Sequence, residues 1–131
     1  MEVNNSQLNN DTIQALNTLI DLDINAVSAF KLTRIIKDIS EIVELKLKME
    51  KKILDKYAEK DENGEFVRPT DQNGNLMNEA VNIIDVTSFT SEMDELMNMK
   101  HNLSHEKLNF EDLNLQTAKV KDLIKLEFLF N

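Results

Sequence analysis

The chain contains two histidines, His101 and His105, and they lie four residues apart. If this segment is helical, both rings project from one face, a spacing at which two imidazoles can hold zinc. A zinc hydrolase also needs a third ligand and a general base, which the glutamate of an HExxH motif supplies. The residues between the two histidines are Asn102, Leu103 and Ser104, so the motif is absent. We therefore expect no metal site here.

Residues 59–70 follow the first half of a calcium-binding EF-hand loop, and residues 69–80 are a second candidate loop, each with glycine at the sixth position. Such a loop is closed by a bidentate glutamate at its twelfth position. That position is Thr70 in the first stretch and Ala80 in the second. Both stretches are better explained as tight turns, because an Asn-Gly dipeptide favours the positive φ of a two-residue hairpin turn. The dipeptides are Asn63-Gly64 and Asn73-Gly74.

Paired carboxylates occur at Asp94-Glu95 and at Glu111-Asp112. Adjacent acidic side chains on a helix or loop point apart, so these pairs do not form the converging carboxylates of an acid–base catalyst. The sequence also has no glycine-rich phosphate loop and no supported Ser-His-Asp motif. We therefore predict a protein that is not an enzyme and that uses no cofactor.

The net charge of -9 is unevenly distributed along the chain. Residues 31–60 carry nine Lys or Arg against six acids, a net of +3, whereas residues 61–112 carry twelve acids against three basic residues, a net of -9. This acid excess argues against direct nucleic-acid binding, because phosphate contacts need clustered cations. An acidic surface can imitate a nucleic acid, or it can simply keep a small protein soluble.

A long helix over residues 26–60 is the element around which the rest is expected to pack. Its apolar residues recur with a mean spacing of roughly 3.7, which is the periodicity of a helix, and a helix of this length would extend about 50 Å. Because it carries few favourable ion pairs at spacing four, it must be supported by tertiary packing or by self-association. A short coiled coil is one alternative. The stripe comprises Ile35, Ile39, Ile42, Leu45, Met49, Ile53 and Tyr57.

A shorter helix is predicted before this one. Asp11, followed three residues later by Gln14, matches a capping box, and the helix should end near Asp21. Asn25 is placed to cap the long helix. The short connection predicts that the two helices pack as a hairpin, with Leu19 and Ile20 near Phe30.

Residues 62–84 are predicted to form a small β-hairpin, with residues 65–68 and 80–84 as its strands. Asp85 should then cap a helix whose apolar residues alternate at spacings of three and four. The carboxylates of this helix, together with the acidic pair near residue 111, are candidate partner-binding groups. They are Glu92, Asp94, Glu95, Glu111 and Asp112.

Both ends of the chain carry weaker signals. Residues 2–8 are a candidate edge strand, residues 106–113 a strand or extended loop, and a last helix is expected to begin at Gln116 or Thr117. The C-terminus is unusually apolar and must therefore dock, either into the protein's own core or onto a neighbouring subunit or partner. Its candidate contact residues are Leu126, Phe128 and Phe130.

Together these patterns predict a single domain over residues 1–131, mainly α with minor β: a long central helix packed by a short N-terminal helix and two later helices. The chain contains no cysteine, and no apolar run approaches the roughly 20 residues of a membrane span. The N-terminus also lacks the pattern of a signal peptide. We expect no membrane association and a cytosolic location.

The order of these elements resembles an uncharacterised family of small proteins from phages and prophages of low-GC Gram-positive bacteria. The likeness lies in the end of the long helix, KYAEKDENGEFV, the strand-like VNIIDV, the acidic SFTSEMDELMN and the late LNFEDL. This resemblance implies a phage-encoded accessory protein that acts in the cytoplasm of an infected bacterium or in the virion. It supplies no catalytic or binding residues.

Two functions then compete. In the first, the protein is a virion structure or assembly component that binds a phage structural protein or further copies of itself. In the second, it is a host-directed inhibitor of a CRISPR nuclease, another defence protein or transcription, and its acidic surface binds the host enzyme. Salt separates these alternatives, because contacts between charges weaken with ionic strength and apolar contacts do not.

Overall fold

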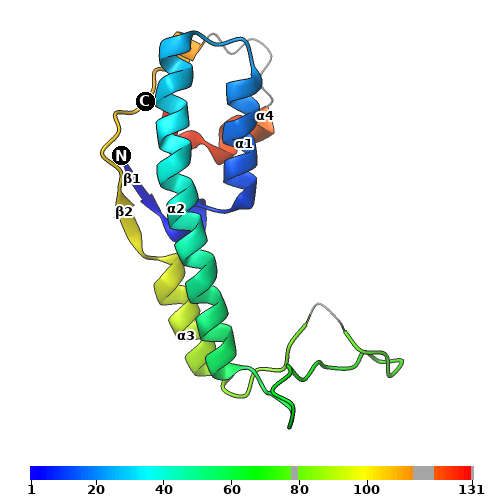
Figure 1. Ribbon diagram of the computed structural model, residues 1–131. Coiled ribbons are helices and arrows are strands. Elements are labelled where there is room, and N and C mark those ends of the chain that lie inside the picture. Colours follow the sequence, from blue (N-terminus) through cyan, green and yellow to red (C-terminus); the bar gives the residue numbers. More distant parts are fainter. Residues whose placement is uncertain (78–79, 114–119, 131) are drawn as a thin grey trace. The chain divides into compact units, whose positions relative to one another are not determined.

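The computed structural model describes residues 1–77, 80–113 and 120–130 (Figure 1). Across these residues the protein is mainly helical with a small antiparallel sheet, which confirms the predicted fold class. Strand β1 (Glu2–Asn4) pairs antiparallel with β2 (Lys100–Asn102), and Val3 lies opposite His101. The helices are α1 (Asn10–Asp21), α2 (Ala26–Tyr57), α3 (Val86–Met97) and α4 (Val120–Lys125), and the strands are β1 (Glu2–Asn4) and β2 (Lys100–Asn102).

The chain divides into two compact units, which we describe separately. Unit 1 comprises Met1–Lys46 and Met97–Asn131, and unit 2 is the continuous stretch Leu47–Leu96. Unit 1 therefore combines both ends of the sequence, whereas unit 2 is formed by the middle. The single-domain organisation stays a prediction.

Helix α1 begins two residues earlier than predicted. The Asn9 side chain accepts a hydrogen bond from the Thr12 backbone N–H at 3.0 Å, and the Asn9 N–H donates to the Thr12 hydroxyl at 3.3 Å. The capping box is thus Asn9–Thr12, and the prediction of Asp11 and Gln14 was wrong. Asn9 takes this role because its backbone is extended while the next residue is already helical. Asp11 instead lies in the first helical turn, where its charge favours the helix dipole.

The N-cap of α2 was predicted correctly, since Asn25 accepts a hydrogen bond from the Ser28 N–H at 2.8 Å. The helix ends at Tyr57 rather than at Lys60. The next residues leave the helix because they pair with later parts of the chain: Ala58 bridges Ile83, and Lys60 bridges Phe66.

The inward face of α2 differs from the predicted stripe. Leu45 and Met49, both expected inside, are exposed. The buried position is instead Lys46, whose ammonium donates to the carbonyl oxygens of Asn5 at 3.1 Å and Leu8 at 2.6 Å. Phe30, expected near Leu19, also stays exposed. The buried residues of α2 recur every three or four positions: Ser28, Leu32, Ile35, Ile39, Val43 and Lys46.

Unit 1 has a continuous hydrophobic core to which both termini contribute. Leu8, Leu16 and Leu32 show no exposure, and neither do Leu126 and Leu129 near the C-terminus. Helix α1 lies against α4 (Figure 1). The apolar C-terminus therefore docks, as predicted, and its residues pack within unit 1. The predicted start of the last helix, at Gln116 or Thr117, lies outside the described residues.

Unit 2 contains α3 beside the last turns of α2, and Asp85 caps α3 as predicted by accepting the Ser88 N–H at 3.0 Å. The predicted strands of a hairpin, residues 65–68 and 80–84, do not form, because these residues pair with the chain at isolated points only. Two tight turns occur instead, each closed by one antiparallel bridge, Lys60 with Phe66 and Thr70 with Leu76. In both turns the glycine has positive φ, 77° at Gly64 and 81° at Gly74. The turns are therefore two copies of one local structure.

Three backbone segments meet at the base of these turns. The Val67 N–H donates to the Glu59 carbonyl, the Glu59 N–H to the Asn82 carbonyl, and the Asn82 N–H to the Val67 carbonyl, each at 2.9 Å. The three residues thus form a closed ring of backbone hydrogen bonds, which we call the backbone ring. The largest separation in sequence within the backbone ring is 23 residues, from Glu59 to Asn82.

Candidate protein-binding surfaces

Glu92, one of the predicted partner-binding acids, lies in a small network between α3 and the end of α2. The Lys56 ammonium is 2.6 Å from its carboxylate, and the Tyr57 hydroxyl donates to the same oxygen at 2.9 Å. The Tyr57 ring also meets Phe89 edge to face, with centroids 6.4 Å apart. The carboxylate of Glu92 is thus already paired within unit 2.

Hydrogen bonds stabilise the charged forms of Glu92, Lys56 and the helix cap Asp85. The hydrogen bond from Lys56, followed by that from Tyr57, lowers the pKa of Glu92 below its ordinary 4.5. The same hydrogen bond, which Lys56 donates to Glu92, raises the pKa of Lys56 above its ordinary 10.5. The backbone N–H of Ser88 lowers the pKa of Asp85 below 3.8. At neutral pH all three groups are therefore charged.

Asp94 and Glu95 differ from Glu92, because both are exposed and neither forms an ion pair with any residue that the structure describes. Close to them in sequence, at the start of α3, Ile84 and Val86 are 74% and 61% exposed. Free carboxylates and exposed apolar side chains thus occur together in residues 84–95, which we call the acidic stretch.

The second predicted acidic pair lies elsewhere. Glu111 is exposed in a short 3-10 helix, Phe110–Leu113, which belongs to unit 1. The side chain of Asp112 lies outside what the structure describes. The structure therefore does not bring the acidic candidates into one site: Glu92, Asp94 and Glu95 belong to unit 2 and Glu111 to unit 1.

The apolar candidates of the C-terminus are occupied inside unit 1. Leu126 and Phe128 belong to its core, and Phe130 packs against that core with partial exposure. The Leu108 N–H donates to the Leu129 carbonyl at 2.7 Å, next to a parallel bridge between Leu108 and Phe130. Their side chains stabilise the fold, and partner binding through them stays a prediction.

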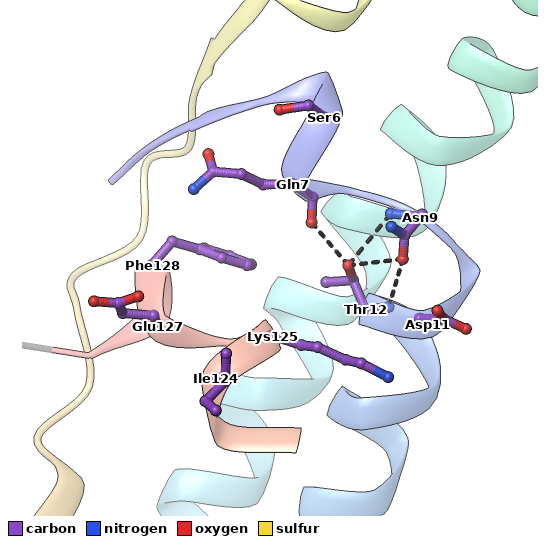
Figure 2. Close-up of a pocket in the computed structure, with 9 residues that line it drawn as sticks. All are labelled: Ser6, Gln7, Asn9, Asp11, Thr12, Ile124, Lys125, Glu127 and Phe128. Atoms are coloured by element: carbon purple, nitrogen blue, oxygen red, sulfur yellow. Dashed lines mark hydrogen bonds between the residues drawn. The ribbon is translucent and has the colours of Figure 1, made fainter. Parts of the chain in front are cut away.

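A cavity of about 280 Å³ lies where the C-terminal residues meet the start of α1 (Figure 2). Figure 2 shows the Thr12 hydroxyl at the centre of its polar wall, where it donates to the Gln7 carbonyl at 2.8 Å and contacts the Asn9 side chain at 3.2 Å. These polar groups satisfy each other as part of the helix cap. The hydrogen bonds of the helix cap therefore account for the polar wall of this cavity. Its described lining residues do not form a converging catalytic group.

The two histidine side chains contact different residues of the chain. The His101 ring lies 2.7 Å from the Asn5 amide oxygen, and the His105 ring lies 2.5 Å from the Asp38 carboxylate. Among the described residues there is no group of three or more His, Asp or Glu side chains that could hold a metal ion.

A second cavity, of about 330 Å³, lies between the first turns of α2 and residues 104–108, all within unit 1. Val27 and Phe30 line it and are 67% and 66% exposed. We call it the basic groove, because three cations also line it: Lys31, Arg34 and Lys107. This groove was not predicted from the sequence. Its signal was the spacing of Val27, Phe30, Lys31 and Arg34, which places two apolar and two basic side chains on one helix face.

The chain matches no protein-family model, and neither curated proteins nor solved structures gave a match. In the part of the chain that the structure describes, no helix combines the length and apolar character required to cross a bilayer.

Proposed function

We propose that this chain is a non-enzymatic, phage-encoded accessory protein that acts by binding other proteins, as a component of the virion or of its assembly. The phage origin rests on the sequence resemblance. The binding role rests on one observation: among the described residues of unit 2, Ala58 is the only buried hydrophobic side chain.

Helix α3 illustrates why this observation points to a partner. It is amphipathic, yet none of its residues is buried. Burial of apolar surface contributes roughly 25 cal/mol per Å², so a segment that leaves its apolar residues accessible gains little from folding alone. Contact with a protein would supply that burial. Further exposed apolar side chains of unit 2 are Leu47, Met49, Leu76 and Met77.

Mass spectrometry of purified virions tests the structural role. The protein should be recovered with the particle at a fixed ratio to the major structural proteins. Its absence from particles, together with capture of a host enzyme by the tagged protein, would overturn the virion role.

A paired variant tests whether unit 2 provides the contact. A double variant, Leu76→Ser combined with Met77→Ser, replaces two exposed apolar residues of unit 2. It should be incorporated into particles less than the wild type, because the apolar contact is lost. The control is Val120→Ser, at an exposed apolar residue of unit 1, and it should incorporate normally. Equal incorporation of both variants would contradict a contact through these turns.

The alternative, a host-directed inhibitor, is favoured by the exposed and unpaired carboxylates of Asp94 and Glu95. Such a surface would bind a basic groove of a host nucleic-acid enzyme. Pulldowns at increasing salt separate the two proposals. Binding through Asp94 and Glu95 should fall steeply with salt and be lost in Asp94→Asn with Glu95→Gln, whereas apolar binding should survive both changes.

A further inference from the structure

The basic groove carries charge that the described part of the chain does not neutralise. Neither Lys31, Arg34 nor Lys107 forms an ion pair with any residue that the structure describes. Glu106 also lines the groove, and His105 is held by Asp38. The groove therefore keeps an excess of positive charge beside the exposed ring of Phe30.

This composition restricts what can bind. A small inorganic anion would satisfy the cations but would leave Val27 and Phe30 exposed. A nucleic acid would be repelled by a chain whose net charge is -9. A protein segment that carries carboxylates and apolar side chains together satisfies both parts of the groove, in the way that amphipathic segments bind grooves in other proteins.

The same chain carries a segment of this kind. The acidic stretch presents Ile84 and Val86 as highly exposed apolar side chains, and Asp94 and Glu95 as unpaired carboxylates. Its chemistry is complementary to the basic groove in both respects, apolar with apolar and negative with positive.

We propose that the basic groove of one copy binds the acidic stretch of a second copy. This inference rests on the proposed protein-binding function and names one partner for it. The contact joins two different surfaces, so it is heterologous: in a pair, one copy retains a free acidic stretch and the other retains a free groove. Repetition of this contact produces a ring or an open chain of subunits, whereas a pairing of identical surfaces would stop at a dimer.

Two variants separate the two surfaces. In the groove variant, Lys31→Glu is combined with Arg34→Glu, and in the stretch variant, Asp94→Lys is combined with Glu95→Lys. Each should weaken self-association by about 100-fold, because like charges then face each other. The control is Lys51→Glu with Lys52→Glu, which makes the same charge change on exposed residues of α2 outside the groove and should associate like the wild type.

Sedimentation at low salt measures the masses, and circular dichroism checks that each variant keeps its helices. The wild type should grow beyond a dimer with concentration and dissociate as salt is added. Each variant alone should remain a monomer. An equimolar mixture of the two variants should associate again beyond a dimer, because the intact groove meets the intact stretch and the reversed charges of the other groove and the other stretch also attract each other.

Three results would overturn the inference: a wild-type monomer at every concentration, variants that associate as the wild type does, or a mixture that stays monomeric. None of them decides the proposed function, because a protein that stays monomeric can still be recovered with virions. Conversely, absence from virions would leave a measured self-association intact.

Discussion

The two units of this protein use similar residues in opposite ways. Unit 1 places leucines such as Leu16, Leu32 and Leu129 in a core without solvent exposure, whereas unit 2 buries only Ala58 among the hydrophobic residues that the structure describes. Unit 1 draws its core from both ends of the sequence, but unit 2 is one continuous stretch. The comparison shows that apolar content alone does not make a core, because distant segments must converge on it.

The units should therefore be stabilised by different forces. Unit 1 gains mainly from burial, and unit 2 mainly from local hydrogen bonds, caps and turns. Regions of low local stability are also those from which binding segments are usually drawn. The following changes, from the largest expected effect to the smallest, test this division.

Leu32→Ala should produce the largest loss. Removing a fully buried leucine from the core of unit 1 should lower the free energy of unfolding by about 3 kcal/mol, through lost burial and the cavity left behind. Urea denaturation followed by circular dichroism measures it. Val27→Ala, an exposed position on the same helix, should change stability by less than about 0.5 kcal/mol. Similar losses for the two variants would show that α2 is not packed as described.

Lys46→Met tests the polar part of that core. The methionine fills the space but cannot donate to the carbonyl oxygens of Asn5 and Leu8, so unfolding should become easier by about 1–3 kcal/mol. Lys51→Met, on an exposed part of α2, serves as the control in the same urea titration. A neutral Lys46→Met variant would mean that these carbonyls find water instead.

Gly64→Ala should have a smaller and local effect. An added Cβ meets nothing within 4 Å, but the backbone at φ +77° disfavours it, so the turn should lose about 1 kcal/mol. Hydrogen exchange should be faster at the Asp61 amide, which bonds across this turn to Glu65 at 2.9 Å, while the core of unit 1 keeps its protection. Glu62→Ala, in the same turn, is the control. Loss of protection in unit 1 as well would contradict the division into two units.

The smallest effect concerns the charge of Glu92. Because its pKa is lowered in the folded protein, its stabilising contribution is present above pH 4.5 and is lost as the pH falls through its folded value. Lys56 has the opposite pH dependence. Because its pKa is raised in the folded protein, its stabilising contribution is present below pH 10.5 and is lost as the pH rises through its folded value. Tyr57 is the only tyrosine and the chain has no tryptophan, so its fluorescence reports this network. The acidic transition should disappear in Glu92→Gln and persist in Glu95→Gln.

Local signals were sufficient for part of the fold. The caps Asn25 and Asp85 and the positive φ of Gly64 and Gly74 were predicted correctly, because each depends on a few neighbouring residues. The two-residue turn was wrong, because each loop spans three residues between hydrogen-bonded partners, as between Asp61 and Glu65. The first capping box was misassigned by two residues, because Asn9 and Asp11 are both good N-cap residues and only the backbone conformation decides between them.

The remaining features depend on distant contacts. Nothing in the sequence near Glu2 indicates that it pairs with Asn102, and nothing near Lys46 indicates the carbonyls that receive its ammonium. Of the candidate surfaces, the exposure of Asp94 and Glu95 could be predicted from charge alone. For the basic groove, the spacing on α2 indicates only one wall, because the groove forms only when residues 104–108 return to the start of α2.

The backbone ring has a practical consequence for labelling the protein. Val67 and Asn82 are hydrogen-bonded to each other and to Glu59. The segment between Val67 and Asn82 therefore begins and ends at fixed points, and these points do not depend on the length of the segment. Doubling such a loop costs only about 0.6 kcal/mol in closure entropy. The exposed second turn, at Asn73, is thus a natural place to insert an epitope or a fluorophore, and it would carry a reporter while the groove and the core remain as they are.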